Sequence, residues 1–189
     1  MKRFWGRGYT RQAYSEEVAK LHSMLLLLIG AAGTGKTLML KTLMRVAEEE
    51  GVGTILFAAH TGVAACLVEF GATLCSLLSL RRTDPTREGE CPDPGTNARE
   101  QFERLAGPLE MVCMIAIDEI SFLNPPFLHH ISVRLQRFLD CSLPFGGLLV
   151  LAMGDFHQLS PVNSASLMTE VVRDTVVAVP GRRGSKKAR

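Results

Sequence analysis

The chain has few of the sequence features of proteins that are stabilised by zinc or disulfides, or that span a membrane. Its five cysteines are scattered and none forms a Cys-x-x-Cys pair, so neither a zinc site nor a disulfide framework is indicated. No apolar run approaches the roughly 18 residues that a membrane span requires, and we expect no membrane partner. No internal repeat is visible, and the net charge of +2 is too small to indicate nucleic-acid binding by itself.

The composition that remains is that of an ordinary globular protein. Of the 189 residues, 47% are hydrophobic and 21% are charged, which is enough to bury a core within a single domain. Cys66, Cys113 and Cys141 have apolar sequence neighbours, and we expect them to be small core residues in a reducing compartment. That compartment would be the nucleus or the mitochondrion in a eukaryote and the cytoplasm otherwise, and the protein is not expected to be secreted.

The two ends of the chain are basic. Residues 1–23 are predicted to form an N-terminal arm with a short helix, since the first 14 residues carry four basic side chains and no acid. An organelle transit peptide has a similar composition and is the alternative. Residues 175–189 are predicted to be a disordered tail. Sequence-blind nucleic-acid binding and nuclear localisation are the alternatives for this tail.

Short apolar runs alternate with helical patterns between these ends, in residues 24–174. Four runs predict buried strands, at residues 24–29, 54–59, 111–117 and 148–153. Helices are predicted at residues 38–50, 62–70, 97–105, 125–139 and 164–173. Residues 81–96 are rich in proline and glycine and are predicted to be an exposed loop or insertion. The alternation predicts an α/β fold with a doubly wound, mainly parallel sheet in one domain.

Residues 30–37 read Gly-Ala-Ala-Gly-Thr-Gly-Lys-Thr and lie between the first predicted strand and the first predicted helix. This is the spacing and the context of the phosphate-binding loop of P-loop NTPases. Glycines let backbone N–H groups turn inward around phosphate oxygens, and the following helix directs its positive end at the same anion. Four residues are assigned to this cradle: Gly30, Gly33, Thr34 and Gly35. A glycine-rich turn without a chemical role is the alternative.

Lys36 and Thr37 complete the loop. Lys36 is expected to reach the β- and γ-phosphates of ATP, and the Thr37 hydroxyl is expected to ligate Mg²⁺.

Polar residues also follow the third and fourth predicted strands, and in a doubly wound sheet ligands lie at the carboxyl ends of the strands. Asp118 is the candidate Mg²⁺ ligand opposite the loop, and Glu119 is the candidate base that orients or deprotonates the attacking water. A helix cap and a first-turn charge are the alternative roles of this pair. Gln158 is a candidate contact to the γ-phosphate or the attacking water, and a surface-loop glutamine is its alternative.

Four segments occur in this order: Gly-Ala-Ala-Gly-Thr-Gly-Lys-Thr at residues 30–37, Ala-Ala-His-Thr-Gly-Val-Ala-Ala at 58–65, Asp-Glu-Ile-Ser at 118–121 and Gly-Asp-Phe-His-Gln-Leu-Ser-Pro-Val at 154–162. Together they resemble the first motor domain of the petite-integration-frequency (Pif-type) DNA helicases, relatives of RecD in helicase superfamily one. The resemblance spans about residues 10–172. It implies a RecA-like domain and ATP-driven 5′-to-3′ movement on single-stranded DNA, in DNA repair, recombination or telomere maintenance.

The matching motifs also imply residue roles. Lys36 and Thr37 bind phosphate and Mg²⁺, Asp118 holds the metal, Glu119 is the base and Gln158 senses the γ-phosphate.

Other matches concern DNA and adenine. Thr61 and Gly62 would meet the DNA backbone, and Thr73 and Ser76 resemble a further DNA-contact motif. Gln12 resembles the glutamine that recognises adenine.

The chain departs from the family pattern at three DNA-side positions, His60, Cys75 and Ser160. It also offers no segment after Val172 for the second RecA-like domain, which supplies arginines across the cleft. We therefore expect an incomplete motor that binds nucleotide, hydrolyses it slowly alone and needs a second motor lobe or partner protein to unwind DNA. A non-helicase nucleotide switch or adaptor and a catalytically inactive helicase remnant are the alternatives.

Overall fold

The centre of the molecule is a five-stranded sheet in the order β1-β5-β4-β2-β3. The computed structural model describes residues 25–80, 91, 93–156 and 167. All neighbouring strands are parallel. The strands are β1 (Leu25–Ile29), β2 (Thr54–Ala59), β3 (Ala72–Thr73), β4 (Val112–Asp118) and β5 (Leu149–Gly154). The predicted α/β fold with a parallel sheet is confirmed.

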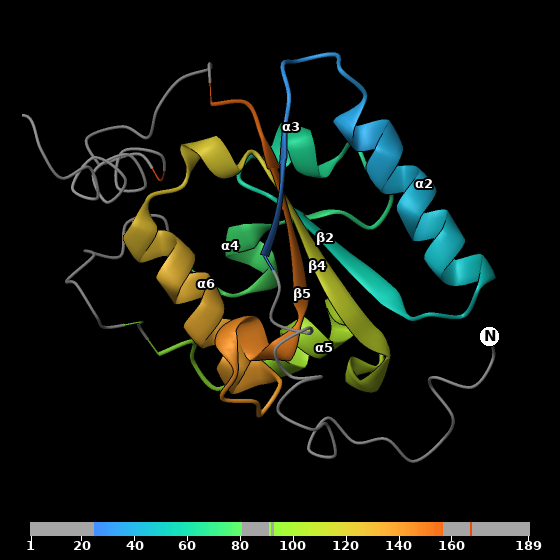
Figure 1. Cartoon of the computed structure of the whole chain (residues 1–189). Coiled ribbons are helices and arrows are strands. Elements are labelled where there is room, and N and C mark those ends of the chain that lie inside the picture. The colour runs from blue at the N-terminus through green and yellow to red at the C-terminus, as the bar shows by residue number, and fades with distance from the viewer. Residues whose placement is uncertain (1–24, 81–90, 92, 157–166, 168–189) are drawn as a thin grey trace, which may run out of the picture.

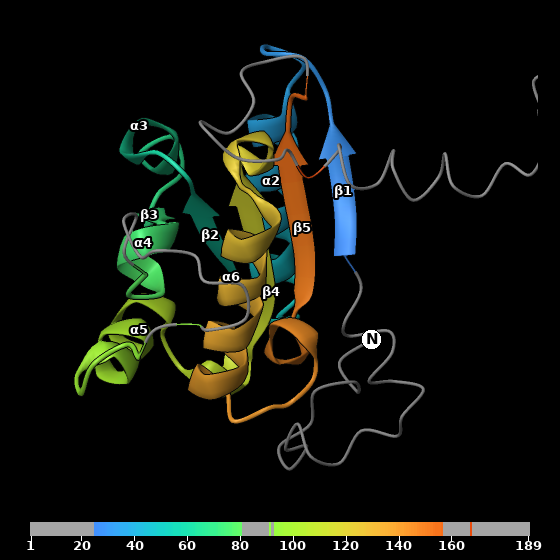
Figure 2. The same cartoon turned by 90° about the vertical axis from the view of Figure 1, so that its left-hand side faces the viewer.

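Helices cover both faces of this sheet (Figure 1). The α-helices are α2 (Lys36–Glu49), α3 (Gly62–Ala65), α4 (Leu74–Leu77), α5 (Ala98–Ala106) and α6 (Pro125–Phe138). Helices α2 and α3 pack on one face, and α4, α5 and α6 pack on the other. In Figure 2, α6 lies in front of the strands and α2 lies behind them. The 3-10 helices are η2 (Leu109–Met111), η3 (Ile120–Phe122) and η4 (Pro144–Gly147).

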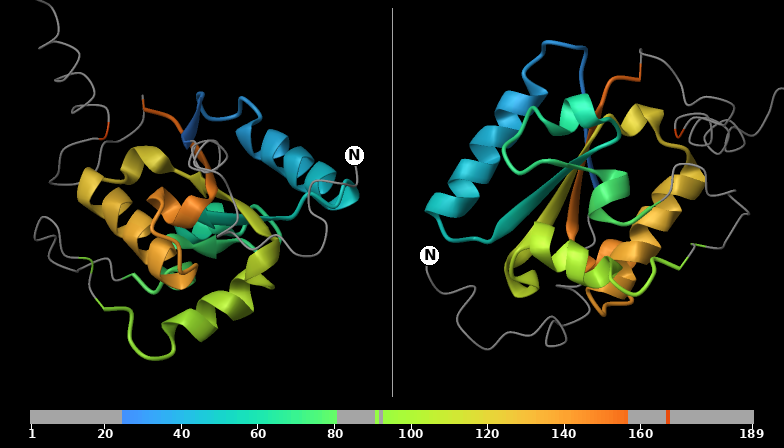
Figure 3. Two further views of the ribbon diagram at one scale, coloured as in Figure 1. Left: turned by 60° about the horizontal axis from the view of Figure 1, so that its bottom comes forward. Right: turned by 180° about the vertical axis from the view of Figure 1, so that it is seen from behind.

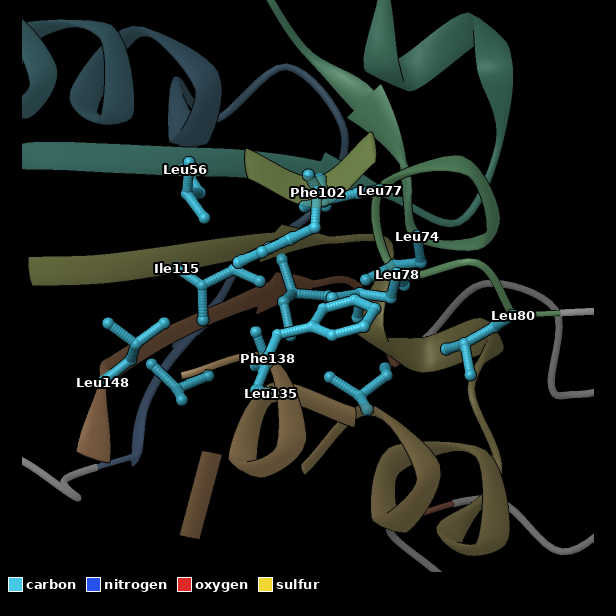
Figure 4. Packing of buried hydrophobic residues seen from close by; sticks show 14 of the residues in the cluster. Leu56, Leu74, Leu77, Leu78, Leu80, Phe102, Ile115, Leu135, Phe138 and Leu148 are labelled. Carbon is cyan, nitrogen blue, oxygen red and sulfur yellow. The ribbon is translucent and has the colours of Figure 1, made fainter. Parts of the chain in front are cut away.

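The apolar strands divide their side chains between two cores because successive residues of a strand point to opposite faces. In β2, Phe57 packs on the α2 side, whereas Leu56 and Ala58 pack on the α6 side. Figure 4 shows the α6 side, where the rings of Phe102 and Phe138 lie 4.9 Å apart between their centroids. Continuous apolar strands of this kind are typical of parallel sheets covered on both faces.

The edge strand β1 was predicted to be buried, and this is wrong for most of its length. Its side chains are exposed apart from half-buried Leu28. The physical reason is its position, since β1 pairs with β5 alone and an edge strand has neighbours on one side only.

Several element boundaries differ from the prediction. Helix α2 begins two residues early, at Lys36, and α3 ends at Ala65 rather than near residue 70. After Ala65 the chain forms turns instead: the Leu67 N–H donates to the Ala64 carbonyl oxygen at 3.1 Å, the Gly71 N–H donates to that of Val68 at 3.0 Å, and Phe70 has a positive φ of 59°. The short elements β3 and α4 were not predicted.

Helix α6 begins as predicted. Asn124 is its N-cap, and the Phe127 N–H donates to Asn124 Oδ1 at 2.8 Å. Pro125 occupies the first helical position, where its missing N–H and fixed φ are tolerated.

The buried cysteine is not one of those predicted. Cys66 is exposed, Cys113 and Cys141 are half-buried, and Cys91 has only 9% of its surface exposed. Apolar neighbours in sequence do not say which way a side chain points, and Cys66 lies at the C-cap of α3. Cys91 also falls within the predicted loop at 81–96, of which residues 81–90 and 92 lie outside the described part.

Arg134 of α6 anchors the segment after α4. Its Nη1 donates to the carbonyl oxygens of Leu78 and Ser79 at 3.0 and 3.1 Å. Its guanidinium lies 5.8 Å from the centre of the Phe138 ring, within the range of a cation–π contact. A buried charge with these partners fixes α4, and with it Thr73 and Ser76, against the body of the domain.

Among the described residues, none of the helices has the length and the hydropathy needed to cross a bilayer. The predicted division into an arm, a domain and a tail stays a prediction. The helix predicted at 164–173 lies outside the described residues, apart from Leu167.

Candidate nucleotide site

The loop between β1 and α2 contains two glycines with positive φ. Gly33 and Gly35 have φ values of 79° and 90°, a region that side-chain-bearing residues adopt at a cost. Apart from the glycine itself and its two chain neighbours, no heavy atom of the described residues lies within 4 Å of the position that a Cβ would occupy on either residue. The Gly30 N–H donates to the Gly154 carbonyl oxygen at 3.1 Å, which ties the start of the loop to the end of β5.

Lys36 folds back over this loop. Its Nζ donates to the carbonyl oxygens of Gly30 and Ala31 at 2.6 and 3.0 Å. Thr34 Oγ1 donates to the same Ala31 oxygen at 2.8 Å. Phosphate oxygens are stronger acceptors for an ammonium group than neutral carbonyls are. The loop therefore holds its lysine where an anion can take over these hydrogen bonds.

Asp118 ends β4 with 8% of its surface exposed, and its Oδ1 accepts from the Glu119 N–H at 2.8 Å. Burial raises the pKa of Asp118 above its ordinary value, and so does the negative charge of Glu119, whereas the hydrogen bond from the Glu119 N–H and the charge of Lys36 act to lower it. The loop and Asp118 lie at the same edge because β1 and β4 pair with opposite sides of β5, with Ile29 beside Gly154 and Ile117 beside Ala152. The two segments share one edge of the sheet, where the loop before α2, α3 and η3 gather at the top of Figure 3, right.

Glu119 is engaged by the neighbouring loop. Its Oε2 accepts from the Thr61 N–H at 3.0 Å and from Thr61 Oγ1 at 2.8 Å. Glu119 has a φ of 59°. Non-glycine residues in this left-handed region are strained and cluster at active sites and ligand-binding sites. Glu119 does not cap η3 with its side chain, and α6 is capped by Asn124.

A ring contact joins the same two loops. The His60 ring stacks on Phe122 of η3 with centroids 6.0 Å apart, and Phe127 meets it edge-on at 6.4 Å. Neither this contact nor the Thr61–Glu119 pair was predicted. An ion-pair or hydrogen-bond partner 58 residues away leaves no periodic signal in a single sequence.

The four predicted DNA-contact residues lie on the β2–β3 side of this edge. Thr73 is in register with Ala59, the last residue of β2, and its Oγ1 accepts from the Ser76 N–H at 3.1 Å. Gly62 begins α3, with no heavy atom within 4 Å of the position for a Cβ. The structure thus brings Thr61, Gly62, Thr73 and Ser76 to one side of the sheet edge, whereas Gln12 and Gln158 lie outside the described residues.

The raised pKa of Asp118 predicts a stability effect. Between its unfolded and folded pKa values the native state binds more protons, so stability falls as pH rises through that window. Asp118→Asn is therefore expected to raise the Tm of the ligand-free protein at pH 7 by a few degrees, and the gain should shrink toward pH 4. Differential scanning fluorimetry from pH 4 to 8 measures it. Asp93→Asn is the control, since Asp93 is exposed and its Oδ1 also accepts a backbone N–H; an equal Tm change in both variants would refute the burial effect.

The comparison with known proteins decides the family. The profile of the PIF1-like helicases matches residues 10–179. The chain belongs to the PIF1-like helicase family. The resemblance inferred from the four sequence segments is thereby confirmed.

Individual proteins similar to this chain also carry the name Pif1. The chain is 34% identical over 135 residues to the ATP-dependent DNA helicase Pif1 of Bdellovibrio bacteriovorus, covering 71% of this chain and 29% of the relative. It is 29% identical over 142 residues to the ATP-dependent DNA helicase PIF1 of Candida albicans, covering 75% of this chain and 15% of the relative. The chain therefore spans a minor part of the length of these relatives.

Solved Pif1 structures share the RecA-like fold. Bacteroides Pif1 bound to ssDNA superposes with a TM-score of 0.61 and 28% identity, over 88% of this chain and 35% of that one. Bacteroides sp. Pif1 in complex with ADP-AlF4 gives a TM-score of 0.56 and 30% identity, over 85% of this chain and 36% of that one.

Proposed function

We propose that this chain supplies the nucleotide-binding motor domain of an ATP-dependent, Pif1-type DNA helicase. The observation that carries the proposal is that the loop before α2 and Asp118 lie at the same edge of the sheet, because β1 and β4 both pair in parallel with β5, although Lys36 and Asp118 are more than 80 residues apart in the sequence. A phosphate loop facing a buried carboxylate is the arrangement with which P-loop NTPases hold a triphosphate and its metal.

The residues present fit Mg²⁺ as well as ATP. Among the described residues there is no cluster of three or more His, Cys, Asp and Glu side chains, and Mg²⁺ does not need one because it keeps several waters and binds one or two protein oxygens plus phosphates. Thr37 and Asp118 would supply those oxygens. When bound, Mg²⁺ neutralises charge on the β- and γ-phosphates.

Each side chain then has a role in turnover. Lys36 exchanges its carbonyl partners for phosphate oxygens, and Glu119 orients or deprotonates the attacking water. Gln158 would sense the γ-phosphate and Gln12 would recognise adenine, both by analogy with the family. Single-stranded DNA would pass Thr61, Gly62, Thr73 and Ser76.

We also propose that this chain takes part in DNA unwinding by a whole helicase. The chain covers 35% of the ssDNA-bound Bacteroides protein. Movement is expected to be 5′-to-3′, in repair, recombination or telomere maintenance. Phosphoryl transfer without an arginine from a second lobe is slower by about a thousandfold or more. Residues 1–189 alone are therefore expected to bind MgATP and DNA, to hydrolyse ATP slowly and not to unwind a duplex.

The test is ATP turnover by the full chain with and without oligo(dT). Stimulation by the oligonucleotide, abolished in Lys36→Ala, supports a helicase motor. Nucleotide binding and turnover that ignore oligo(dT) would instead support the nucleotide switch or adaptor. Adding a candidate second lobe in trans should increase the stimulated rate.

A further inference from the structure

We propose that Thr61 is a positioning residue for Glu119, and that a DNA strand competes with Glu119 for the same two hydrogen-bond donors. Strand binding would thereby release the catalytic carboxylate, so that ATP is turned over when DNA is present. This inference rests on the proposed function, because it takes Glu119 as the base and the β2–α3 loop as a strand contact.

The donors of Thr61 are fully committed in the strand-free structure. Thr61 has one backbone N–H and one hydroxyl proton, and both are donated to Glu119 Oε2, at 3.0 and 2.8 Å. The hydroxyl oxygen also accepts from the Ala64 N–H at 3.3 Å. A phosphate oxygen is an acceptor and needs a donor. Thr61 therefore cannot donate to a DNA phosphate while it keeps both bonds to Glu119.

The Oε2 oxygen of Glu119 has no acceptor direction left beyond its two bonds from Thr61. A carboxylate oxygen has two lone-pair directions, and Thr61 fills both on Oε2. In this arrangement Oε2 cannot accept a proton from water, and the two bonds from Thr61 hold the carboxylate, with its other oxygen Oε1, in one orientation. Loss of Thr61 frees the carboxylate to reorient toward the nucleotide, where a base must come within hydrogen-bond reach of the water it activates.

The backbones on either side are held, so the side chain of Glu119 is the element that changes. His60 stacks on Phe122 and joins the two loops next to the Thr61–Glu119 pair. Asp118 Oδ1 accepts the Glu119 N–H at 2.8 Å, which fixes the peptide of Glu119. A strand that binds Thr61 would thus exchange side-chain partners without moving either loop.

Reciprocity makes the competition measurable as binding. If the strand has to displace Glu119 from Thr61, the bonds between Thr61 and Glu119 weaken strand binding by some factor. Removing the Glu119 side chain should then tighten strand binding by that factor. We expect Glu119→Ala to bind dye-labelled oligo(dT) about fivefold more tightly than the parent chain in fluorescence anisotropy. Asp118→Asn removes the same unit charge one residue away and keeps an acceptor for the Glu119 N–H. It is expected to tighten binding clearly less, and equal tightening in both variants would leave only a charge effect and overturn the proposal.

Turnover gives an independent readout. Thr61→Val removes the hydroxyl bond and is expected to raise strand-free kcat about fivefold and to lower the ratio of stimulated to strand-free turnover, with KM for ATP unchanged. Thr61→Ser, which keeps the hydroxyl, should behave as the parent does. Thr42→Val is the control: the Thr42 hydroxyl donates to the Leu38 carbonyl oxygen within α2 at 3.0 Å, away from Glu119 and the proposed strand contacts, so strand-free kcat should not rise.

A purely structural role of Thr61 would give a different pattern, with Thr61→Val lowering strand-free and stimulated turnover together. That result would overturn the inference. The two proposals fail in different ways. If the parent chain binds neither MgATP nor oligo(dT), the proposed function fails and the inference falls with it. If both ligands bind but Glu119→Ala matches Asp118→Asn, the inference alone fails.

Discussion

Replacing Lys36 with alanine is expected to weaken MgATP binding by about a hundredfold, or about 2.7 kcal/mol. Lys36 Nζ carries the positive charge over the loop and now donates to two neutral carbonyls. A triphosphate would replace them with charged acceptors, and losing one partner of such a pair costs about 2–5 kcal/mol. Titration with a fluorescent ATP analogue measures the affinity directly.

Lys41→Ala is the matched control, since it removes an exposed lysine from the same helix. It should bind nucleotide as the parent does. Adenosine, which lacks phosphates, should bind the parent and Lys36→Ala equally. An unchanged affinity for ATP in Lys36→Ala would exclude the loop between β1 and α2 as the phosphate site.

Replacing Glu119 with glutamine is expected to lower strand-stimulated ATP turnover by about 10²- to 10⁴-fold, the usual contribution of a general base. The amide is close in shape to the carboxylate but cannot take a proton from water. The affinity for MgATP should change little, because Lys36, Thr37 and Asp118 remain in place.

Single-turnover hydrolysis with the chain in excess over ATP, in the presence of oligo(dT), separates the chemical step from product release. Glu110→Gln is the control, because Glu110 is exposed and precedes β4 at the end opposite Glu119. A Glu119→Gln chain that hydrolyses ATP at the parent rate would require another base. A parallel loss in Glu110→Gln would point to a general loss of folding.

The parallel sheet and the loop between β1 and α2 could be predicted because short, contiguous segments of the sequence carry the signal for each. Strand β2 has the predicted bounds, and β4 and β5 are displaced by one residue. Continuous apolar runs predicted burial on both faces correctly for the inner strands β2, β4 and β5 but not for the edge strand β1. The phosphate loop needs only a few residues and its two flanking elements. Asp118 and Glu119 followed from one topological rule, that strand ends in a parallel sheet converge.

The features that escaped prediction depend on contacts between distant segments. Helix α3 ends at Ala65, and Gly71 approaches it so closely that a Cβ on Gly71 would lie 2.2 Å from the Ala65 carbonyl oxygen; no helical pattern in the sequence reports this approach. The burial of Arg134 depends on carbonyl oxygens of Leu78 and Ser79, 56 and 55 residues away. The bond between Thr61 and Glu119 joins two residues for which the sequence had assigned separate roles, one on DNA and one on ATP.

The most direct test of a shared site is paramagnetic broadening of backbone amide NMR signals by ATP with Mn²⁺ in place of Mg²⁺. A single site between the two segments predicts strong broadening at Gly33 and Gly35 and also at Asp118 and Glu119, with little effect at Gly53 at the opposite end of the sheet. MgATP and the Lys36→Ala chain serve as the controls without broadening. Broadening at only one of the two segments would contradict a triphosphate and metal held between them.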